Sequence, residues 1–252
     1  MADARRQQRC RYARIVSAIL PVFPLGTVLF PGLVLPLHIF EEKYRTLVRE
    51  LIASTDDGPQ EFGVVTMRRG LEVQTTAEAE GTPPADDRPV TAAELYEVGC
   101  TAELRQVTEL PDGRFDIVTV GRRRFTVLKV EQSPEQYLRA EVEWLSEEES
   151  ANDTAELLAP RVLSAFRRYL DLLRPDSEVL DQVPDDPTVL SHLIAATAQL
   201  TTDERHMLLA APSTATRLRT ELKLLTREAG LLARVRAVPV PLSDLARPAS
   251  PN

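Results

Sequence analysis

Residues 14–41 read RIVSAILPVFPLGTVLFPGLVLPLHIFE, and the 26 residues between Arg14 and Glu41 carry no formal charge when His38 is neutral. This length, with arginines before it, is typical of a membrane-spanning helix. The stretch also contains four prolines, namely Pro21, Pro24, Pro31 and Pro36. Each proline inside a helix costs about 3 kcal/mol, so a continuous helix is excluded. AILPVFPL and LVLPLHIF have the character of short strands, joined through a turn at Pro31-Gly32, and we expect folded β structure rather than a membrane span or a cleaved signal peptide.

The charge of the chain is unevenly placed. The 252 residues carry a formal net charge of −8, but residues 1–14 hold five arginines and one aspartate, so the remainder carries −12. An acidic body repels phosphate, which argues against nucleic acid as a partner, and we expect residues 1–14 to be a mobile basic tail. Cys10 and Cys100 are too few and too scattered for a disulfide framework. Without a membrane span or a credible signal, the expected location is the cytoplasm.

Strand and helix patterns divide the chain near residue 146. A helix is expected after Glu41, then a buried strand at 61–67, a mobile loop at 74–93, a long hairpin over 95–132 and a strand at 137–145. Pro111-Asp112-Gly113 has the residues of the hairpin turn, and Gly121 interrupts the second arm as a bulge or corner does.

Residues beyond 146 have helical patterns. One apolar stripe is formed by Leu158, Val162, Phe166, Tyr169 and Leu173, and a heptad-like seam by Leu218, Leu222, Leu225, Ala229 and Leu232. Asp186 before Pro187 is typical of a helix start, and Thr201 with Glu204 forms the pattern of a capping box. The seam fits packing within a helical bundle or a coiled coil with a partner. A disordered tail is expected over 239–252.

Catalytic motifs are missing from the sequence. Gly58 and Gly63 have the outer spacing of a phosphate loop, but Val64 and Val65 replace its lysine and hydroxyl residue. There is no Gly-x-Ser-x-Gly, no Gly-x-Gly-x-x-Gly and no His-Glu-x-x-His. The three histidines are scattered, which favours structural or surface roles over metal binding. We therefore expect no cofactor, no metal site and no enzymatic activity.

The order of several segments resembles one known family. LPVFPLGTVLFPGLVLPLHIFEEKYRTLVREL, FGVVTMRRGLEV, ELPDGRFDIVTVGRRRFTVLKV, VPDDPTVLSHLIA and ERHMLLAAPSTATRLRTELKLLTRE are similar to the substrate-binding N-terminal domain of Lon proteases, over about residues 19–236. The resemblance implies an α+β fold, with a PUA-like β-barrel at 15–146 followed by an α-helical bundle at 147–238. It also implies a stand-alone member, because the chain contains neither the ATPase nor the peptidase module.

The resemblance implies recognition of polypeptides without catalysis. The expected partners are unfolded or partly exposed polypeptides, with a protease or a chaperone as a further partner in protein quality control. A groove between the barrel and the bundle is the expected binding site. Two alternatives remain open, namely an RNA-binding module, because PUA-like barrels can bind RNA, and a hydrolase with an unrecognised site. Arg124, after the interruption at Gly121, is expected to turn inward and pair with Glu41.

Overall fold

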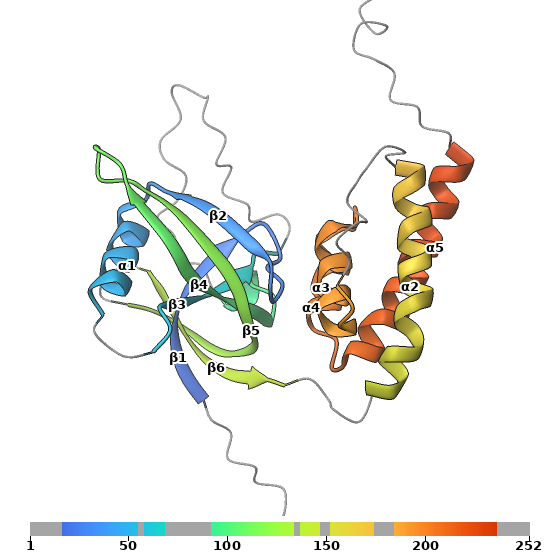
Figure 1. Ribbon diagram of the computed structural model, residues 1–252. Helices are drawn as coiled ribbons and strands as arrows, with labels where there is room; N and C mark the ends of the chain where they lie inside the picture. Colours follow the sequence, from blue (N-terminus) through green and yellow to red (C-terminus); the bar gives the residue numbers. More distant parts are fainter. Residues whose placement is uncertain are drawn as a thin grey trace, which may run out of the picture.

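The computed structural model describes residues 17–54, 58–68, 92–133, 137–146, 152–173 and 184–235. A strand lobe (residues 17–146) and a helical lobe (residues 152–235) lie side by side (Figure 1). The expected tails at 1–14 and 239–252 lie outside the described residues, as do residues 74–91 of the expected loop. None of the described helices is both long and apolar enough to cross a membrane.

Six strands form one mixed sheet: β1 (Ser17–Leu25), β2 (Val34–Ile39), β3 (Glu61–Thr66), β4 (Val98–Glu109), β5 (Phe115–Gln132) and β6 (Leu138–Leu145). β1 pairs in parallel with β3, and the other described pairings are antiparallel. β5 pairs with β4 along one edge, and with β2 and then β6 along the other. Because the sheet continues from β6 through β1 and β3 to β4, its pairing returns to β5 and closes on itself.

The uncharged stretch at 14–41 forms β1 and β2, which lie in different parts of the sheet. The turn before β2 contains Pro31 and Gly32, and Gly32 has a φ of +80°, which glycine adopts without strain. The interpretation of this stretch as strands is confirmed. A short 3-10 helix, Ala92–Glu94, precedes β4.

A bulge follows Gly121 in β5. Gly121 is opposite Ala102 of β4 and Arg124 is opposite Cys100, so two residues of β5 stand against one residue of β4. A Cβ atom on Gly121 would lie 2.2 Å from the carbonyl oxygen of Phe30, so only glycine fits here. The predicted interruption is confirmed, and it marks the place where β5 changes its partner from β2 to β6.

Helix α1 (Glu42–Ala53) packs against the sheet and confirms the helix expected after Glu41. Its Tyr44, Leu47 and Val48 are buried, and the ring of Tyr44 stacks on Phe23 of β1 with 3.9 Å between the centroids. This face joins the apolar core of the strand lobe.

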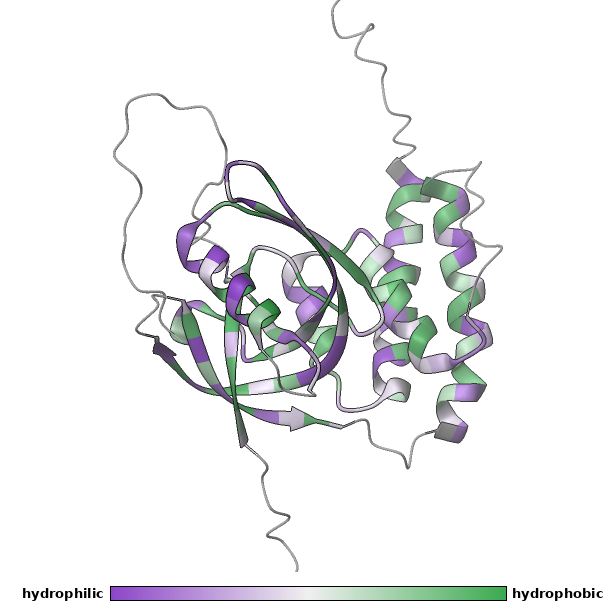
Figure 2. Ribbon diagram, turned by 60° about the vertical axis from the view of Figure 1, so that its left-hand side comes forward, coloured by the Kyte–Doolittle hydropathy of each residue, from purple (hydrophilic) through white to green (hydrophobic). Residues whose placement is uncertain are grey.

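The helical lobe contains α2 (Asn152–Leu173), α3 (Pro187–Thr197), α4 (Thr202–Leu209) and α5 (Thr214–Val235). The expected N-cap is confirmed, since the Asp186 carboxylate accepts hydrogen bonds from the N–H groups of Thr188 and Val189. The capping box of Thr201 and Glu204 is confirmed as well. Apolar residues recur along the two long helices (Figure 2), and the predicted stripe and seam pack against each other within the chain.

The two lobes share a packed apolar core. Leu208, Leu209 and Leu224 of the helical lobe join one buried cluster with Leu29 and Phe30 of the strand lobe. The expected groove between the lobes is therefore filled with side chains where these residues meet.

Arg124 crosses this junction. Its side chain is only 4 % exposed, and one guanidinium nitrogen donates to the carbonyl oxygens of Leu209 and Ala211, at 2.6 Å each. Leu209 is the last residue of α4 and Ala211 follows its C-cap, so both carbonyls lie at a helix end, where acceptors are left unsatisfied. A charged donor from β5 thus binds the end of α4 and fixes the helical lobe on the sheet.

A second buried arginine binds the helices together. Arg217 of α5 is fully buried and donates to the carbonyl oxygen of Leu208 and to the hydroxyl of Ser191. One turn further along α5, the Glu221 carboxyl is 1 % exposed and accepts no hydrogen bond from the residues that the structure describes. Burial raises the pKa of Glu221 well above its usual value, an effect that Arg217 only partly offsets.

His192 of α3 lies in the same junction. Burial, reinforced by the charges of Arg217 and Arg124, lowers the pKa of His192 to about 2, so its ring is neutral at physiological pH. The two arginine charges in the junction therefore disfavour a third positive charge on His192.

Replacing Gly121 should destabilise the fold. We expect Gly121→Ala to lower the free energy of unfolding by about 1–3 kcal/mol, because the new methyl group would overlap the Phe30 carbonyl. Gly58→Ala is the control, since no atom lies within 4 Å of its added Cβ. Urea unfolding of both variants measures the difference, and equal losses would contradict the tight contact.

Removing the charge of Arg124 should destabilise the junction. We expect Arg124→Met to cost about 2–5 kcal/mol, because two buried carbonyl groups would lose their donor. The control is Arg122→Met: the Arg122 side chain is exposed and Glu103 keeps Arg105 as a partner, so the loss should be less than about 1 kcal/mol. Urea unfolding followed by Trp144 fluorescence gives both values. If Arg124→Met unfolds at the same urea concentration as Arg122→Met, Arg124 does not hold the lobes.

The pH dependence of stability should change when Glu221 cannot ionise. The raised pKa of Glu221 means that the folded protein keeps a proton on this carboxyl, whereas the unfolded chain releases it above about pH 4.3. Glu221 therefore lowers the free energy of unfolding as pH rises. Glu221→Gln should therefore gain stability over the wild type as pH rises from 5 to 8. The exposed control Glu156→Gln should show no such trend, and a parallel pH profile for all three proteins would contradict the burial of an unpaired carboxyl.

Candidate functional site

The outer face of β2 carries apolar side chains into solvent. Val34 is 62 % exposed, Pro36 and His38 are exposed, and Phe40 just after the strand is 49 % exposed. The alternate residues Leu35, Leu37 and Ile39 point inward and pack in the core. This alternation follows from the two-residue period of a strand, and it gives one face of β2 the composition of a contact surface.

β2 is also an edge strand. Among the described residues it pairs only with β5. The N–H of Gly121 donates to the carbonyl oxygen of Leu33 at 2.9 Å, so Leu33 belongs to the set of residues whose backbone groups bond to β5. In an antiparallel ladder the bonded residues alternate, so Val34, Pro36 and His38 direct their backbone groups away from β5. Pro36 has no N–H to offer, as expected for proline at an edge, but three carbonyl oxygens and two N–H groups remain for another strand.

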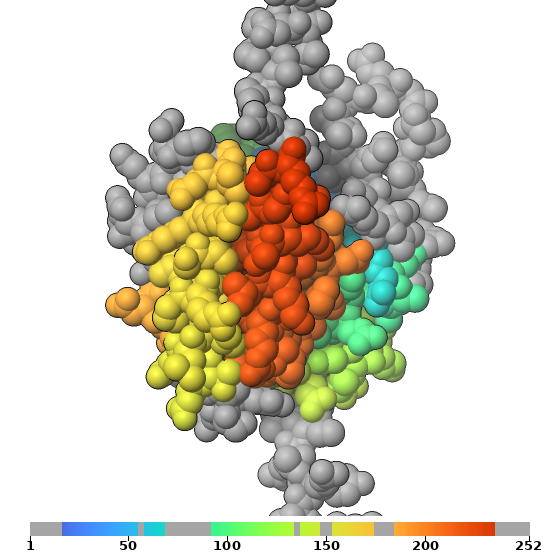
Figure 3. Space-filling model, turned by 90° about the vertical axis from the view of Figure 1, so that its right-hand side faces the viewer, coloured from blue at the N-terminus to red at the C-terminus, as the bar shows by residue number. Residues whose placement is uncertain are grey.

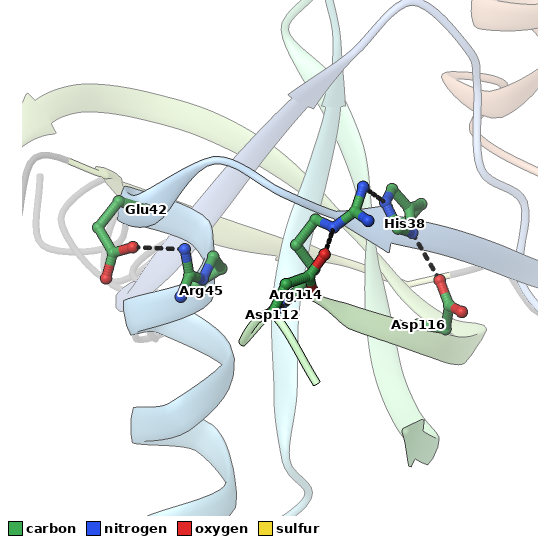
Figure 4. A network of polar contacts seen from close by, with 6 residues as sticks. All are labelled: His38, Glu42, Arg45, Asp112, Arg114 and Asp116. Atoms are coloured by element: carbon green, nitrogen blue, oxygen red, sulfur yellow. Dashed lines mark hydrogen bonds and ion pairs between the residues drawn. The ribbon is translucent and has the colours of Figure 1, made fainter. Parts of the chain in front are cut away.

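A row of polar side chains borders this face (Figure 4). His38 lies between two partners, with Nδ1 2.6 Å from Asp116 and Nε2 3.3 Å from Arg114. Arg114 also donates to Asp112 at 2.6 Å. Because arginine offers only donors, Nε2 of His38 must accept and Nδ1 carries the proton that goes to Asp116. The row holds the His38 ring in one orientation at the surface.

A hollow of about 380 Å³ lies beside this row, across β2, β5 and β4. Pro36, Val118 and Ile117 supply its apolar part, and His38, Asp116 and Gln106 are among its polar lining. This volume is near the lower end of the range of about 300–1,000 Å³ that is typical of ligand pockets, and it is large enough for one or two amino-acid side chains.

Cys100 does not contribute to this face, and it is not among the residues that line the hollow. Burial raises the pKa of the Cys100 thiol to about 12, so this cysteine is a core residue and not a nucleophile. In the part of the chain that the structure describes, no three histidine, cysteine or acidic residues are placed to hold a metal ion.

The expected pair of Arg124 and Glu41 does not form. Glu41 precedes α1 and its carboxylate pairs with Lys43 at 2.9 Å, while Arg124 binds carbonyl oxygens at the end of α4. The strand register explains the separation. Ile39, close to Glu41, pairs with Phe115, and Arg124 lies nine residues further along β5, or about 30 Å in an extended strand.

Sequence reasoning missed the residues of the β2 face. Val34, Pro36, His38 and Phe40 alternate with the buried leucines in the sequence itself, so the signal was present. That this strand is an edge follows from its pairing with β5, which no local pattern reveals.

Comparison with known proteins places the chain in a family. The family model described as the ATP-dependent protease La (LON) substrate-binding domain matches residues 19–227. The Lon protease of Anaeromyxobacter dehalogenans is 30 % identical over 225 residues, covering 86 % of this chain and 24 % of that protein. Lon protease 1 of Thermus thermophilus is 30 % identical over 216 residues, covering 83 % of this chain and 24 % of that protein. The chain thus spans about a quarter of the length of these relatives.

Two solved structures share the fold. The N-terminal domain of Mycobacterium avium complex Lon protease superposes with a TM-score of 0.58 at 21 % identity, covering 83 % of this chain and 98 % of that one. The Lon N-terminal domain protein from Xanthomonas campestris gives 0.53 at 20 % identity, covering 82 % and 98 %. With the family model matching most of its length, the chain belongs to the LON substrate-binding domain family.

Proposed function

We propose that this protein recognises polypeptides at the outer face and free edge of β2, and that it does so without catalysing a reaction on them. The observation that carries the proposal is a strand with exposed Val34 and Phe40, an unpaired edge and an adjoining hollow. Membership of a substrate-binding family supports it.

The geometry of β2 suits an extended segment of an unfolded chain. Such a segment can add to the edge as a strand, accepting from and donating to the backbone of Val34 and His38. Its alternate side chains would contact Val34 and Phe40 or enter the hollow. Because Pro36 has no N–H, the added strand would form one hydrogen bond fewer than a full strand pairing. We expect reversible binding, with a dissociation constant on the order of 1 μM or weaker.

The finer assignments from the sequence belong to the same proposal. The closed pairing of five strands supports a PUA-like β-barrel, and helices α2–α5 support a helical bundle beside it. We propose an adaptor or substrate-recognition role in the cytoplasm, with a protease or a chaperone as the further partner. Lon proteases are the relatives that suggest this role.

A charged residue on the β2 face should weaken polypeptide binding. We expect Val34→Lys to reduce the affinity for a labelled, reduced and alkylated unfolded protein at least tenfold, measured by fluorescence anisotropy. Ile19→Lys is the matched control, because Ile19 on β1 is 74 % exposed and lies away from β2. Binding by the wild type should change little between low and high salt, since apolar and backbone contacts dominate.

Two outcomes would contradict the proposal. Equal loss in both variants would remove β2 as the site. Tight, salt-sensitive binding of RNA without binding of any polypeptide would favour the RNA-binding alternative.

A further inference from the structure

A second hollow lies between α2 and α5 of the helical lobe. These helices lie side by side and form most of the face in Figure 3. The hollow has a volume of about 410 Å³, and small residues form much of its floor, including Ala165, Ala229 and Gly230. An added Cβ on Gly230 would meet nothing within 4 Å, so the space above this glycine is open.

Positive charges line and flank the hollow. Arg161 and Arg168 of α2 line it directly, two helical turns apart. Arg219 and Lys223 of α5 are exposed and fall at helical spacing with Thr226 and Gly230, which line the other wall. The acidic residues of α2 are not among the residues that line it.

These cations differ from most others in the described structure because they form no ion pair with another described residue. Six described arginine and lysine side chains form neither a hydrogen bond nor an ion pair, and all six lie on α2 and α5: Arg161, Arg167, Arg168, Arg219, Lys223 and Arg234. On the strand lobe, by contrast, exposed arginines such as Arg114, Arg122 and Arg123 bind carboxylates. A chain with a net charge of −8 thus keeps a local cluster of unpaired positive charge.

Exposed leucines extend the same face. Leu157 is 75 % exposed and Leu172 is 41 % exposed, and both fall on the stripe of α2 that contains Arg161 and Arg168. The stripe is about 22 Å long at 1.5 Å per residue, the length of a four-turn helix. The face thus has leucines at its two ends, small residues between them and cations at its sides. These features complement a helix that has an apolar stripe bordered by carboxylates.

We propose that the α2–α5 face binds an acidic amphipathic helix of a partner protein, lying along the groove between the two helices. Carboxylates of the partner pair with Arg161 and Arg168, and its apolar side chains contact Leu157 and Leu172 and enter the hollow. This surface is separate from the β2 face, so the chain can hold a partner on one lobe and an extended polypeptide on the other.

A long polyanion fits this face less well than a short acidic helix. The two aromatic residues of the described helices here, Phe166 and Tyr169, are buried and offer no surface for base stacking. Screening confines the attraction to about 10 Å at 0.1 M salt, and a longer nucleic acid would extend from the cluster over an acidic body.

Binding of synthetic peptides tests the proposal. The probe is a labelled 16-residue helical peptide with leucine on one face and glutamate beside it, and its controls are a sequence-scrambled version and a version with lysine in place of glutamate. We expect the acidic amphipathic peptide to bind at least tenfold more tightly than either control in fluorescence anisotropy. Equal binding of the scrambled peptide would overturn a helical groove.

Variants of the protein locate the site. The double variant Arg161→Glu, Arg168→Glu should lower the affinity for the acidic peptide at least tenfold and raise the affinity for the lysine peptide. The control is Arg167→Glu, because Arg167 is an exposed cation nearby that does not line the hollow, and this change should alter either affinity less than threefold. Gly230→Leu should block binding by filling the open space without loss of helix stability. Val34→Lys should leave this peptide unaffected, so failure here is distinct from failure of the β2 site. Tighter binding of RNA or of anionic vesicles with the same dependence on Arg161 and Arg168 would overturn the proposal in favour of a polyanion site.

Discussion

The bulge after Gly121 is the constraint on which the rest of the structure depends. It lets one long strand pair with β2 before the bulge and with β6 after it, and so closes the sheet. The extra residue also turns Arg124 out of the regular alternation and into the junction, where its guanidinium binds carbonyl oxygens at the end of α4. The fold of the strand lobe and the attachment of the helical lobe therefore share one local cause.

The same bulge explains why β2 has a free edge. β6 takes over the edge of β5 beyond Gly121, and the closed circuit runs through β6, β1, β3 and β4. β2 stays outside that circuit, and among the described strands it pairs on one side only. A protein that must avoid aggregation normally protects such an edge, and Pro36 provides part of this protection. The exposed Val34 and Phe40 remain, and a surface kept apolar at an open edge is consistent with binding rather than with stability.

Local signals in the sequence predicted most of the elements. Asp186 and the pair Thr201–Glu204 mark helix starts because their side chains bond to nearby N–H groups, and they do so in the structure. Long-range contacts could not be predicted in the same way. Arg124 donates to backbone carbonyls of Leu209 and Ala211, and because a backbone carbonyl carries no residue signature, the sequence pointed to Glu41 and not to these acceptors. The α2–α5 face was equally hidden, because a seam of leucines predicts the buried side of a helix and not the charges left unpaired on its outer side.

Amide hydrogen exchange of the full chain, with and without an unfolded polypeptide, tests the central claim most directly. If the ligand adds as a strand to β2, the N–H groups of Val34 and His38 should exchange more slowly in the complex, because these groups point away from β5 and gain an acceptor there. The N–H groups of Leu35 and Leu37, already bonded to β5, should change much less. Unchanged exchange at Val34 and His38 in a saturated complex would contradict polypeptide recognition at this edge.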